Sequence, residues 1–222
     1  MSRREEAKEE RRRRIITAAR DLIRETGDAG LSMRAIASRA QVSLSTPYNL
    51  FGSKRAILIA VLEDIREFHE RFSRLRRTSA IERIFQALRL SIGFYVEDPD
   101  FYRTLWTGMF DLSGKEVRAA LDRPERDAFW LSLVEAAAQE GALLPQIDSV
   151  ELLRDLDLTF AAVMMSWVLG GLEVNELQAA AGYGYALTLR GAATAAWQDR
   201  LAEKIGAFQD QMTASRQDAN AA

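Results

Sequence analysis

Three serines within 22 residues divide one stretch of the chain into short segments. Ser32, Ser43 and Ser53 each stand directly before an apolar pattern with helical spacing. A serine at this position can accept a hydrogen bond from a free amide of the first helical turn, which stabilises the helix by about 1 kcal/mol. We therefore predict two helices of about eight residues, 33–40 and 44–51, joined by a tight turn and followed by a longer helix over 54–75.

The remaining sequence also favours helices. The chain has 222 residues and only four prolines, and Ala, Leu, Arg and Glu dominate its composition. Hydrophobic residues make up 48% of it, which is enough for a genuine core. We predict an all-α fold, because apolar periodicity and stop signals indicate a first helix from within 5–14 to residue 25 and further helices at 79–97, 100–110, 116–122, 125–141, 149–172 and 178–208.

The length fits a small N-terminal module and a larger helical body. The module, a three-helix helix-turn-helix domain, is predicted to cover residues 1–55, and the body residues 56–212. Residues 213–222 are small and polar, so we predict a disordered tail there.

Charge is distributed unevenly between these two parts. Residues 1–55 hold 13 Lys and Arg against 7 Asp and Glu, whereas residues 56–222 hold 17 against 25. A basic front end on an acidic body is typical of a protein whose N-terminal part meets a polyanion. The alternative is that the excess reflects a charged surface helix. The run 11–14 is better explained as a solvated helix face than as a contact with the neighbouring groove or backbone of DNA.

Several classes of function are disfavoured by what the sequence lacks. There is no cysteine, and the only histidine, His69, has no second histidine with which to hold zinc. Asp155 and Asp157 are two residues apart and so do not share a helix face. We predict no catalytic residue, no metal and no cofactor, and keep a helical enzyme as a distant alternative.

The sequence also points away from membranes. The first 14 residues are charged throughout and no apolar segment of a secretory signal follows them. The longest nearly apolar run, 158–172, is shorter than a bilayer requires and is better explained as a buried helix. We expect no membrane partner and a cytoplasmic location.

The segment 32–51 has the features of a helix-turn-helix, in which the second helix enters the major groove of DNA. Ala37 and Ala40 allow two helices to approach closely, and apolar anchors stand behind them at Ile36, Val42 and Phe51. The side chains left to face outward can hydrogen-bond bases or phosphates, and Leu44 can contact a thymine methyl group. These outward side chains are Ser45, Thr46, Tyr48 and Asn49. Tyr48 and Lys54 are better placed to contact phosphates than bases. The alternative for Tyr48 is that its ring packs between helices.

These residues resemble the TetR family of bacterial repressors. The resemblance covers roughly residues 15–62 and rests on the runs AARDLIRETG, SMRAIASRAQVS and STPYNLFGSKRAIL. It implies that Arg34 and residues 43–49 contact an operator, while Tyr48 and Lys54 hold phosphates. The implied DNA-binding residues are Arg34, Ser43, Leu44, Ser45, Thr46, Tyr48, Asn49 and Lys54.

Three positions depart from the family pattern. Gln41 stands where glycine is common, in a turn that can require a positive φ. Leu50 replaces a more usual polar or aromatic residue. Pro47 lies within the second helix of the helix-turn-helix. If Ser43 is the N-cap, Pro47 is the fourth helical residue and the helix loses one hydrogen bond; a proline within the first turn would cost the helix little.

Two stripes near the C-terminus are suited to dimer formation, which would let the protein read two half-sites. One is apolar and lies within 149–172; the other consists of small residues on the last predicted helix. The alternative is that both stripes are core within one chain, and the family resemblance favours a homodimer. The proposed interface residues are Phe160, Met164, Trp167, Gly184, Thr188, Gly191 and Ala195.

The middle of the body is rich in large aromatic residues, which typically line small-molecule pockets but more often simply pack a core. The resemblance implies a ligand cavity here and therefore an apolar or aromatic effector. The candidate ligand-binding residues are Phe94, Tyr102, Trp106, Phe110, Phe129 and Trp130. The resulting hypothesis is a repressor that binds a palindromic double-stranded DNA operator as a dimer and is released by the effector; the alternative is an adaptor that keeps the fold without binding DNA.

Overall fold

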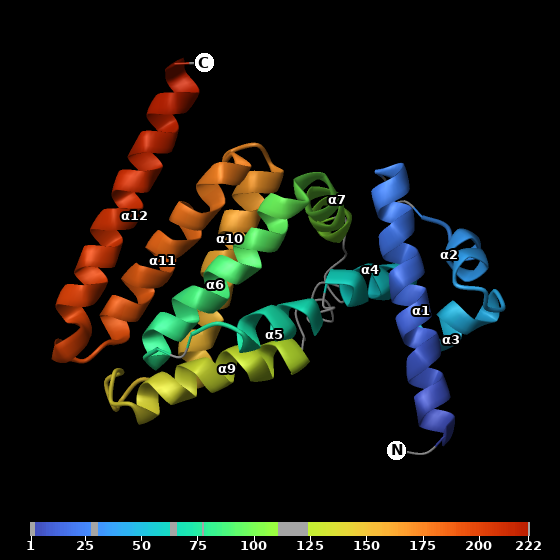
Figure 1. Ribbon diagram of the computed structural model, residues 1–222, viewed down its shortest axis with the longest axis horizontal. Coiled ribbons are helices and arrows are strands. Elements are labelled where there is room, and N and C mark those ends of the chain that lie inside the picture. Colours follow the sequence, from blue (N-terminus) through green and yellow to red (C-terminus); the bar gives the residue numbers. More distant parts are fainter. Residues whose placement is uncertain (1–2, 28–30, 63–65, 77, 111–123, 222) are drawn as a thin grey trace. The chain divides into compact units, whose positions relative to one another are not determined.

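The structure is a computed structural model that describes residues 3–27, 31–62, 66–76, 78–110 and 124–221. Helices account for nearly all of this part of the chain, and its only β-type pairing is one isolated bridge, so the predicted all-α class is confirmed (Figure 1). The helices are α1 (Arg3–Thr26), α2 (Met33–Arg39), α3 (Ser45–Phe51), α4 (Lys54–Leu62), α5 (Arg66–Ser73), α6 (Ala80–Glu97), α7 (Pro99–Phe110), α9 (Pro124–Gln139), α10 (Ser149–Val168), the short 3₁₀ helix η1 (Val174–Glu176), α11 (Leu177–Ala192) and α12 (Ala195–Ala221).

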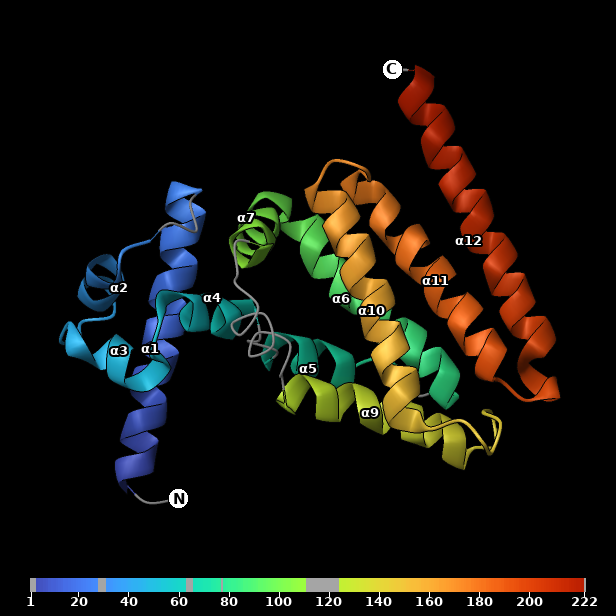
Figure 2. The ribbon, with the colours of Figure 1, turned by 180° about the vertical axis from the view of Figure 1, so that it is seen from behind.

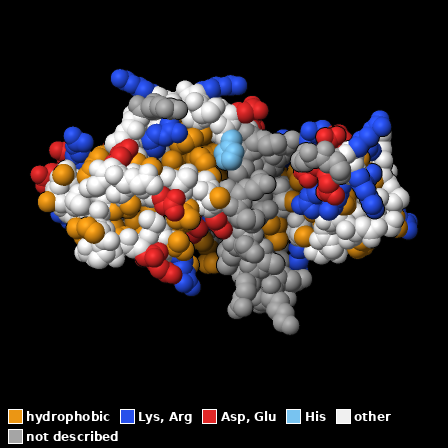
Figure 3. Space-filling model, turned by 90° about the horizontal axis from the view of Figure 1, so that it is seen from below, with side chains coloured by type: hydrophobic (Ala, Val, Ile, Leu, Met, Phe, Trp, Pro, Cys, Tyr) orange, Lys and Arg blue, Asp and Glu red, His pale blue; other side chains and the backbone are white. Residues whose placement is uncertain are grey.

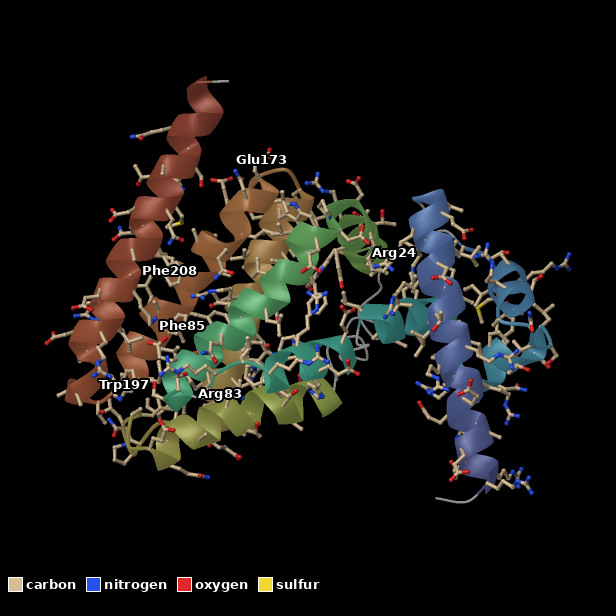
Figure 4. All side chains as sticks on the ribbon, viewed as in Figure 1. Arg24, Arg83, Phe85, Glu173, Trp197 and Phe208 are labelled. Carbon is tan, nitrogen blue, oxygen red and sulfur yellow. The ribbon has the colours of Figure 1, made fainter. Side chains whose placement is uncertain are left out.

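The chain divides into two compact units. The N-terminal unit comprises Met1–Ile65 with Asp100–Arg123, and the C-terminal unit comprises Arg66–Pro99 with Pro124–Ala222. This division differs from the predicted domains 1–55 and 56–212, because α4 and α7 both contribute to the N-terminal core. In that unit the guanidinium of Arg24 lies 4.7 Å from the centre of the Phe101 ring, so α7 is packed on α1 (Figure 4).

In the N-terminal unit, α1 is the central helix and packs against α2, α3 and α4. Its apolar stripe begins at Ile15, which is fully buried, and continues through Ala18, Ala19 and Ile23. The spacing of three and four residues turns all these side chains toward the same neighbours. This core fixes the position of the helix-turn-helix formed by α2 and α3.

In the C-terminal unit, α11 lies between α10 and α12 and also packs on α6 (Figure 2). We predicted one helix over 178–208, but the chain turns sharply between α11 and α12. Ala193 is extended, and Thr194 donates from its amide to the carbonyl of Ala142 at 2.9 Å and from its hydroxyl to that of Gly141 at 3.0 Å. The turn therefore depends on a distant loop, which local sequence patterns do not reveal.

The predicted helix over 54–75 is helical in its described parts, α4 and α5, and residues 63–65 lie outside the described part. Helix α4 packs in the N-terminal core, whereas α5 belongs to the other unit. The tail predicted to be disordered is helical, since α12 continues to Ala221. No proline or glycine follows Gly206, so nothing in the sequence stops this helix. The predicted helix 116–122 lies outside the described residues.

Candidate DNA-binding interface

Helix α2 is fixed at its start by the first of the three predicted serine caps. The hydroxyl of Ser32 accepts a hydrogen bond from the amide of Ala35 at 3.1 Å, which confirms this cap. Ala37 and Ala40 are both buried, as the predicted close approach of helices requires. Small side chains at these positions allow α2 and the turn after it to lie directly against the core.

An exposed ion pair also joins α2 to α1. Arg39 donates two hydrogen bonds to the carboxylate of Glu25, at 2.7 and 2.6 Å. This hydrogen bonding lowers the pKa of Glu25 below its ordinary value. Both side chains are solvated, so the pair serves to orient α2 more than to stabilise the fold.

The turn between α2 and α3 contains the only residue other than glycine with a positive φ in the described part of the chain. Gln41 has φ 53°, which confirms the expectation for this position. Its amide donates to the carbonyl of Ser38 at 3.1 Å, and the amide of Val42 donates to the carbonyl of Ala37 at 3.0 Å. These two bonds end the helix in the Schellman arrangement, for which a left-handed residue is needed.

Replacing Gln41 with glycine is expected to stabilise the protein by about 0.5–1 kcal/mol, because glycine adopts positive φ without the Cβ clash that other residues suffer. The free energy of unfolding in urea measures the effect. Gln41→Ala retains the clash and serves as the control, which should show no gain. A lower stability for Gln41→Gly would contradict the strain inferred at this turn.

Arg14 supports the same turn from α1. Its guanidinium donates to the carbonyl of Ala40 and, at 2.8 Å, to that of Gln41. Charge-assisted bonds of this kind are about twice as strong as bonds between neutral groups. The sequence predicted a groove contact or a solvated residue at this position; the role of Arg14 in holding the turn was not predicted.

Helix α3 begins at Ser45, one residue later than predicted, and the predicted cap at Ser43 is wrong. Leu44 occupies the N-cap position and no side chain caps the helix. The amide of Thr46 donates to the carbonyl of Ser43 at 2.9 Å, so it does not need the serine hydroxyl. That hydroxyl instead lies within hydrogen-bonding distance of the hydroxyls of Ser45 (3.1 Å) and Thr46 (2.8 Å).

The later start of α3 explains how the helix tolerates Pro47. With Ser45 as the first helical residue, Pro47 is the third and lies within the first turn. An amide at this position has no partner inside the helix, so a proline costs no hydrogen bond. Pro47 is also the buried residue of α3 and anchors the helix on its inner side.

The C-terminal end of α3 is held by a second arginine of α1. Arg12 donates to the carbonyl of Leu50 at 2.9 Å, and its guanidinium lies 4.3 Å from the centre of the Phe51 ring. Leu50 and Phe51 themselves pack against the N-terminal core, as does Val42. The anchoring predicted for Val42 and Phe51 is confirmed, and Leu50 is a packing residue.

The outer side of α3 and its approach carry most of the predicted DNA-binding residues. Tyr48 exposes 51% of its surface, which does not support the alternative that it is a packing aromatic. Its neighbour one turn earlier, Leu44, is similarly exposed. The exposed members of the predicted set are Arg34, Ser43, Leu44, Ser45, Tyr48 and Asn49, and the half-buried ones are Thr46 and Lys54.

Lys54 follows α3 directly, at the first position of α4. The predicted cap at Ser53 is confirmed, since its hydroxyl accepts from the amide of Ala56 at 3.1 Å. Gly52 has φ 77° and reverses the chain between the two helices. The turn therefore places a lysine immediately beyond the C-terminal end of α3, within the same unit.

Comparison with known proteins agrees with this geometry. Residues 15–61 match the model of a family described as bacterial regulatory proteins, tetR family. The match begins at the first fully buried residue of α1 and ends in α4, so it contains the whole helix-turn-helix. Residues 15–61 are therefore similar to the DNA-binding domain of the TetR family.

Solved structures of TetR regulators share the fold. FadR from Thermus thermophilus, in complex with lauroyl-CoA, is 20% identical with a TM-score of 0.68, covering 82% of this chain and 95% of that chain. A regulator from Rhodococcus sp. RHA1 is 20% identical with a TM-score of 0.65, covering 82% and 96%. TylP from Streptomyces fradiae is 20% identical with a TM-score of 0.61, covering 95% and 99%. A comparison with curated protein sequences gives no match.

The aromatic residues proposed to bind an effector are divided between the two units of the chain. Tyr102 and Trp106 belong to the N-terminal unit, where Trp106 is buried. Phe94, Phe129 and Trp130 belong to the C-terminal unit. The side chain of Phe110 lies outside the described part.

Within the C-terminal unit, the aromatic residues of α9 form part of a larger cluster. Phe129 packs edge-on against Phe68 and Phe72 of α5, with ring centres 5.2 and 5.0 Å away. Trp130 contacts Tyr185 of α11 at 6.3 Å. Phe94 lies apart from these contacts, under the guanidinium of Arg71 at 4.6 Å. Sequence analysis therefore identified members of this cluster but not their partners.

A charged group that sequence analysis missed lies beside this cluster. Arg126 of α9 forms ion pairs with Asp157 of α10 at 2.6 Å and with Asp127 at 3.0 Å. Burial and the neighbouring Asp157 both raise the pKa of Tyr185, so its phenol stays protonated. The sequence showed only that Asp157 does not share a helix face with Asp155; its arginine partner is 31 residues away.

The residues predicted for a dimer interface differ in their exposure within one chain. Met164 and Trp167 are fully buried within one chain, so they cannot contact a partner. Phe160 packs against Tyr95 at 6.0 Å, and a side chain at Gly184 would meet Thr159. Thr188 is half-buried, Gly191 is exposed, and Ala195 belongs to α12 after the turn.

The outer side of α10 carries apolar residues instead. Leu158, Met165 and Leu169 expose 61%, 45% and 75% of their surfaces and lie at helical spacing. Leu187 of the adjacent helix α11 is also exposed. We call these four residues the outer stripe.

Within the described residues, none of the helices is both long enough and apolar enough to span a bilayer.

The C-terminal unit also has a surface groove of about 450 Å³ between α6 and α12. Its lining is mainly charged, which does not fit the apolar effector site expected from the sequence. The lining residues are Glu82, Arg200, Glu203, Lys204 and Ala207.

Proposed function

We propose that this protein is a TetR-family transcriptional repressor that binds a palindromic operator as a homodimer and is released by a small apolar or aromatic effector. The observation that carries the proposal is the outer side of α3. There Ser45 and Asn49 lie one turn apart, exposed, on a helix whose opposite side is anchored by Pro47. Polar side chains in this position can read base edges in the major groove.

The remaining contacts position the protein on the duplex. Arg34 lies at the beginning of α2 and Lys54 just beyond α3, and both can bind phosphates while α3 reads bases. Leu44 offers an apolar surface suited to a thymine methyl group. The predicted DNA-binding residues thus have complementary roles in specificity and affinity.

The homodimer is supported by the outer stripe, which consists of Leu158 and Met165 of α10, Leu169 at its C-terminal cap and Leu187 of α11. Apolar side chains that are this exposed on adjacent helices typically mark a protein interface. A second copy would cover the same stripe with its own, since a two-fold interface uses one surface twice. Two helices from each copy then form a four-helix contact.

An effector site is supported by the aromatic cluster of the C-terminal unit. Phe129 and Trp130 offer an apolar wall, and Arg126 with Asp157 offers charged groups that orient a ligand. The similar FadR structure holds lauroyl-CoA, a ligand with a long apolar chain. For release to follow, the effector must bind more tightly to the state that does not bind DNA.

The test is DNA binding by the intact protein and two variants. Selection from a random duplex library, followed by titration, should yield a palindromic site. Lys54→Ala is expected to weaken binding to all duplexes by about 5–10-fold, because it removes a phosphate contact, whereas Asn49→Ala should reduce discrimination at particular bases by about 1–3 kcal/mol. Failure to enrich any DNA sequence would overturn the proposal. If Lys54→Ala changed the sequence preference without weakening binding to all duplexes, the phosphate role of Lys54 would be wrong.

A further inference from the structure

Helix α1 extends well beyond the domain that it supports. It begins at Arg3, but the first buried residue is Ile15, and every residue from 3 to 11 is exposed. Twelve residues of helix correspond to roughly 18 Å. Figure 1 shows this part of α1 running past α3 toward the N-terminus. The structure thus has about three turns of helix that make no contribution to the core.

The charges on these turns are separated by side. At 100° per residue, Arg4, Lys8 and Arg11 fall within an arc of about 60°. The same arc contains Ile15 and Leu22, which face the core further along the helix. Glu5, Glu6 and Glu9 fall on the other side. Figure 3 looks toward the end of the molecule where α1 begins, and both Lys and Arg and Asp and Glu side chains are visible in that region of the N-terminal unit.

The basic side has a defined direction relative to α3. Arg12 and Arg14 flank it on the helix, and they reach the C-terminal end of α3 and the turn before it. Arg4, Lys8 and Arg11 therefore lie on the same side of α1 as the helix-turn-helix, closer to the N-terminus. A ligand of α3 that extends past the helix-turn-helix would meet them.

These cations have no carboxylate partner among the described residues. On this part of α1, Arg13 forms an ion pair with Glu10, and both residues lie outside the arc. No ion pair is found there for Arg4, Lys8 or Arg11. Like charges one turn apart repel each other by a few tenths of a kcal/mol, and a polyanion would remove this repulsion. Duplex DNA carries about one negative charge per 1.7 Å of its axis and is such a polyanion.

We propose that the first three turns of α1 form an arm that lies along the phosphate backbone beside the site read by α3, with Arg4, Lys8 and Arg11 contacting phosphates. The inference rests on the proposed function and extends it. It assigns to residues outside the helix-turn-helix a part of the affinity for DNA that does not depend on the base sequence. The arm is helical before DNA arrives, so binding does not require the segment to fold.

The test compares two triple variants of the full-length protein. In the arm variant Arg4, Lys8 and Arg11 are replaced by glutamine, and in the control variant Glu5, Glu6 and Glu9 are replaced by glutamine. Glutamine is a good helix former, and circular dichroism checks that the helix content is retained. Fluorescence anisotropy over a range of salt concentrations gives the affinity for a random-sequence duplex and for the selected operator.

For the arm variant, the slope of log affinity against log salt is expected to fall by up to about 5 per dimer, because each lost phosphate contact contributes about 0.9. The preference for operator over random duplex should stay within about two-fold. The control variant should keep the wild-type slope. An arm variant with the wild-type slope would overturn the inference, even if an acidic partner protein then proved to bind the arm. A wild-type protein that binds random duplex through the arm but enriches no operator would overturn the proposed function alone.

Discussion

Replacing Met165 with glutamate is expected to convert the protein to monomers and to weaken operator binding by at least about 100-fold. Met165 lies in the middle of the outer stripe and exposes 45% of its surface. In a two-fold interface the substitution places two carboxylates in one apolar contact, which costs their hydration. A monomer then reads a single half-site and loses the gain in affinity that two linked half-sites provide.

Sedimentation equilibrium and operator titration measure the two effects. Val96→Glu is the matched control, because Val96 of α6 is 49% exposed but does not belong to the outer stripe. It should leave both the dimer and the affinity unchanged. A dimeric Met165→Glu protein together with a monomeric Val96→Glu protein would show that the interface lies elsewhere.

The other large effect is expected inside the C-terminal unit, where Gly182→Ala should lower the free energy of unfolding by about 1–3 kcal/mol. Gly182 is buried in α11, and a Cβ there would lie 2.4–2.8 Å from three atoms of the Phe208 ring. Phe208 is itself stacked on Phe85 of α6 at 6.1 Å, and Figure 4 shows the two rings between α6 and α12. The ring cannot move without disturbing a second contact.

Gly191→Ala is the control for this substitution. It adds the same methyl group to the same helix, but no atom lies within 4 Å of the new Cβ. It should stabilise the protein by up to about 1 kcal/mol, the difference in helix propensity. In the Gly182→Ala background, Phe208→Leu is expected to be less harmful than in the wild type, which a double-mutant cycle detects. Additive effects would mean that the two residues do not clash.

The helix-turn-helix could be predicted from sequence because its signals are local. The caps at Ser32 and Ser53, the small residues at Ala37 and Ala40, and the positive φ at Gln41 all depend on neighbours within a few residues. The exposed side of α3 followed from the same pattern. Sequence analysis failed there only at Ser43, where a backbone carbonyl took the bond expected for the hydroxyl.

Partners that are distant in the sequence could not be predicted. Arg12 and Arg14 reach residues 38 and 26 positions away, and nothing in their own surroundings distinguishes them from solvated arginines. The turn at Thr194 depends on a carbonyl 52 residues earlier. Such interactions exist only after the fold has formed.

The choice between the two sides of α10 illustrates a limit of periodicity. Met164 and Met165 are adjacent and equally apolar, yet one is fully buried and the other exposed. Helical spacing identifies each side as a stripe, but it does not say which one faces the chain's own core. Only the packing of α10 on α11 and α9 decides this.

The two arginines of α1 have a mechanical consequence. Helix α3 has seven residues and no capping side chain; Arg12 ties its C-terminal end to α1, and Arg14 ties the turn before it to α1. A tilt or rotation of α1 would therefore turn α3 with it as a rigid piece and change the angle at which Asn49 and Tyr48 approach a base pair. In the proposed repressor, a small reorientation of α1 would be enough to change DNA binding without any distortion of α3 itself.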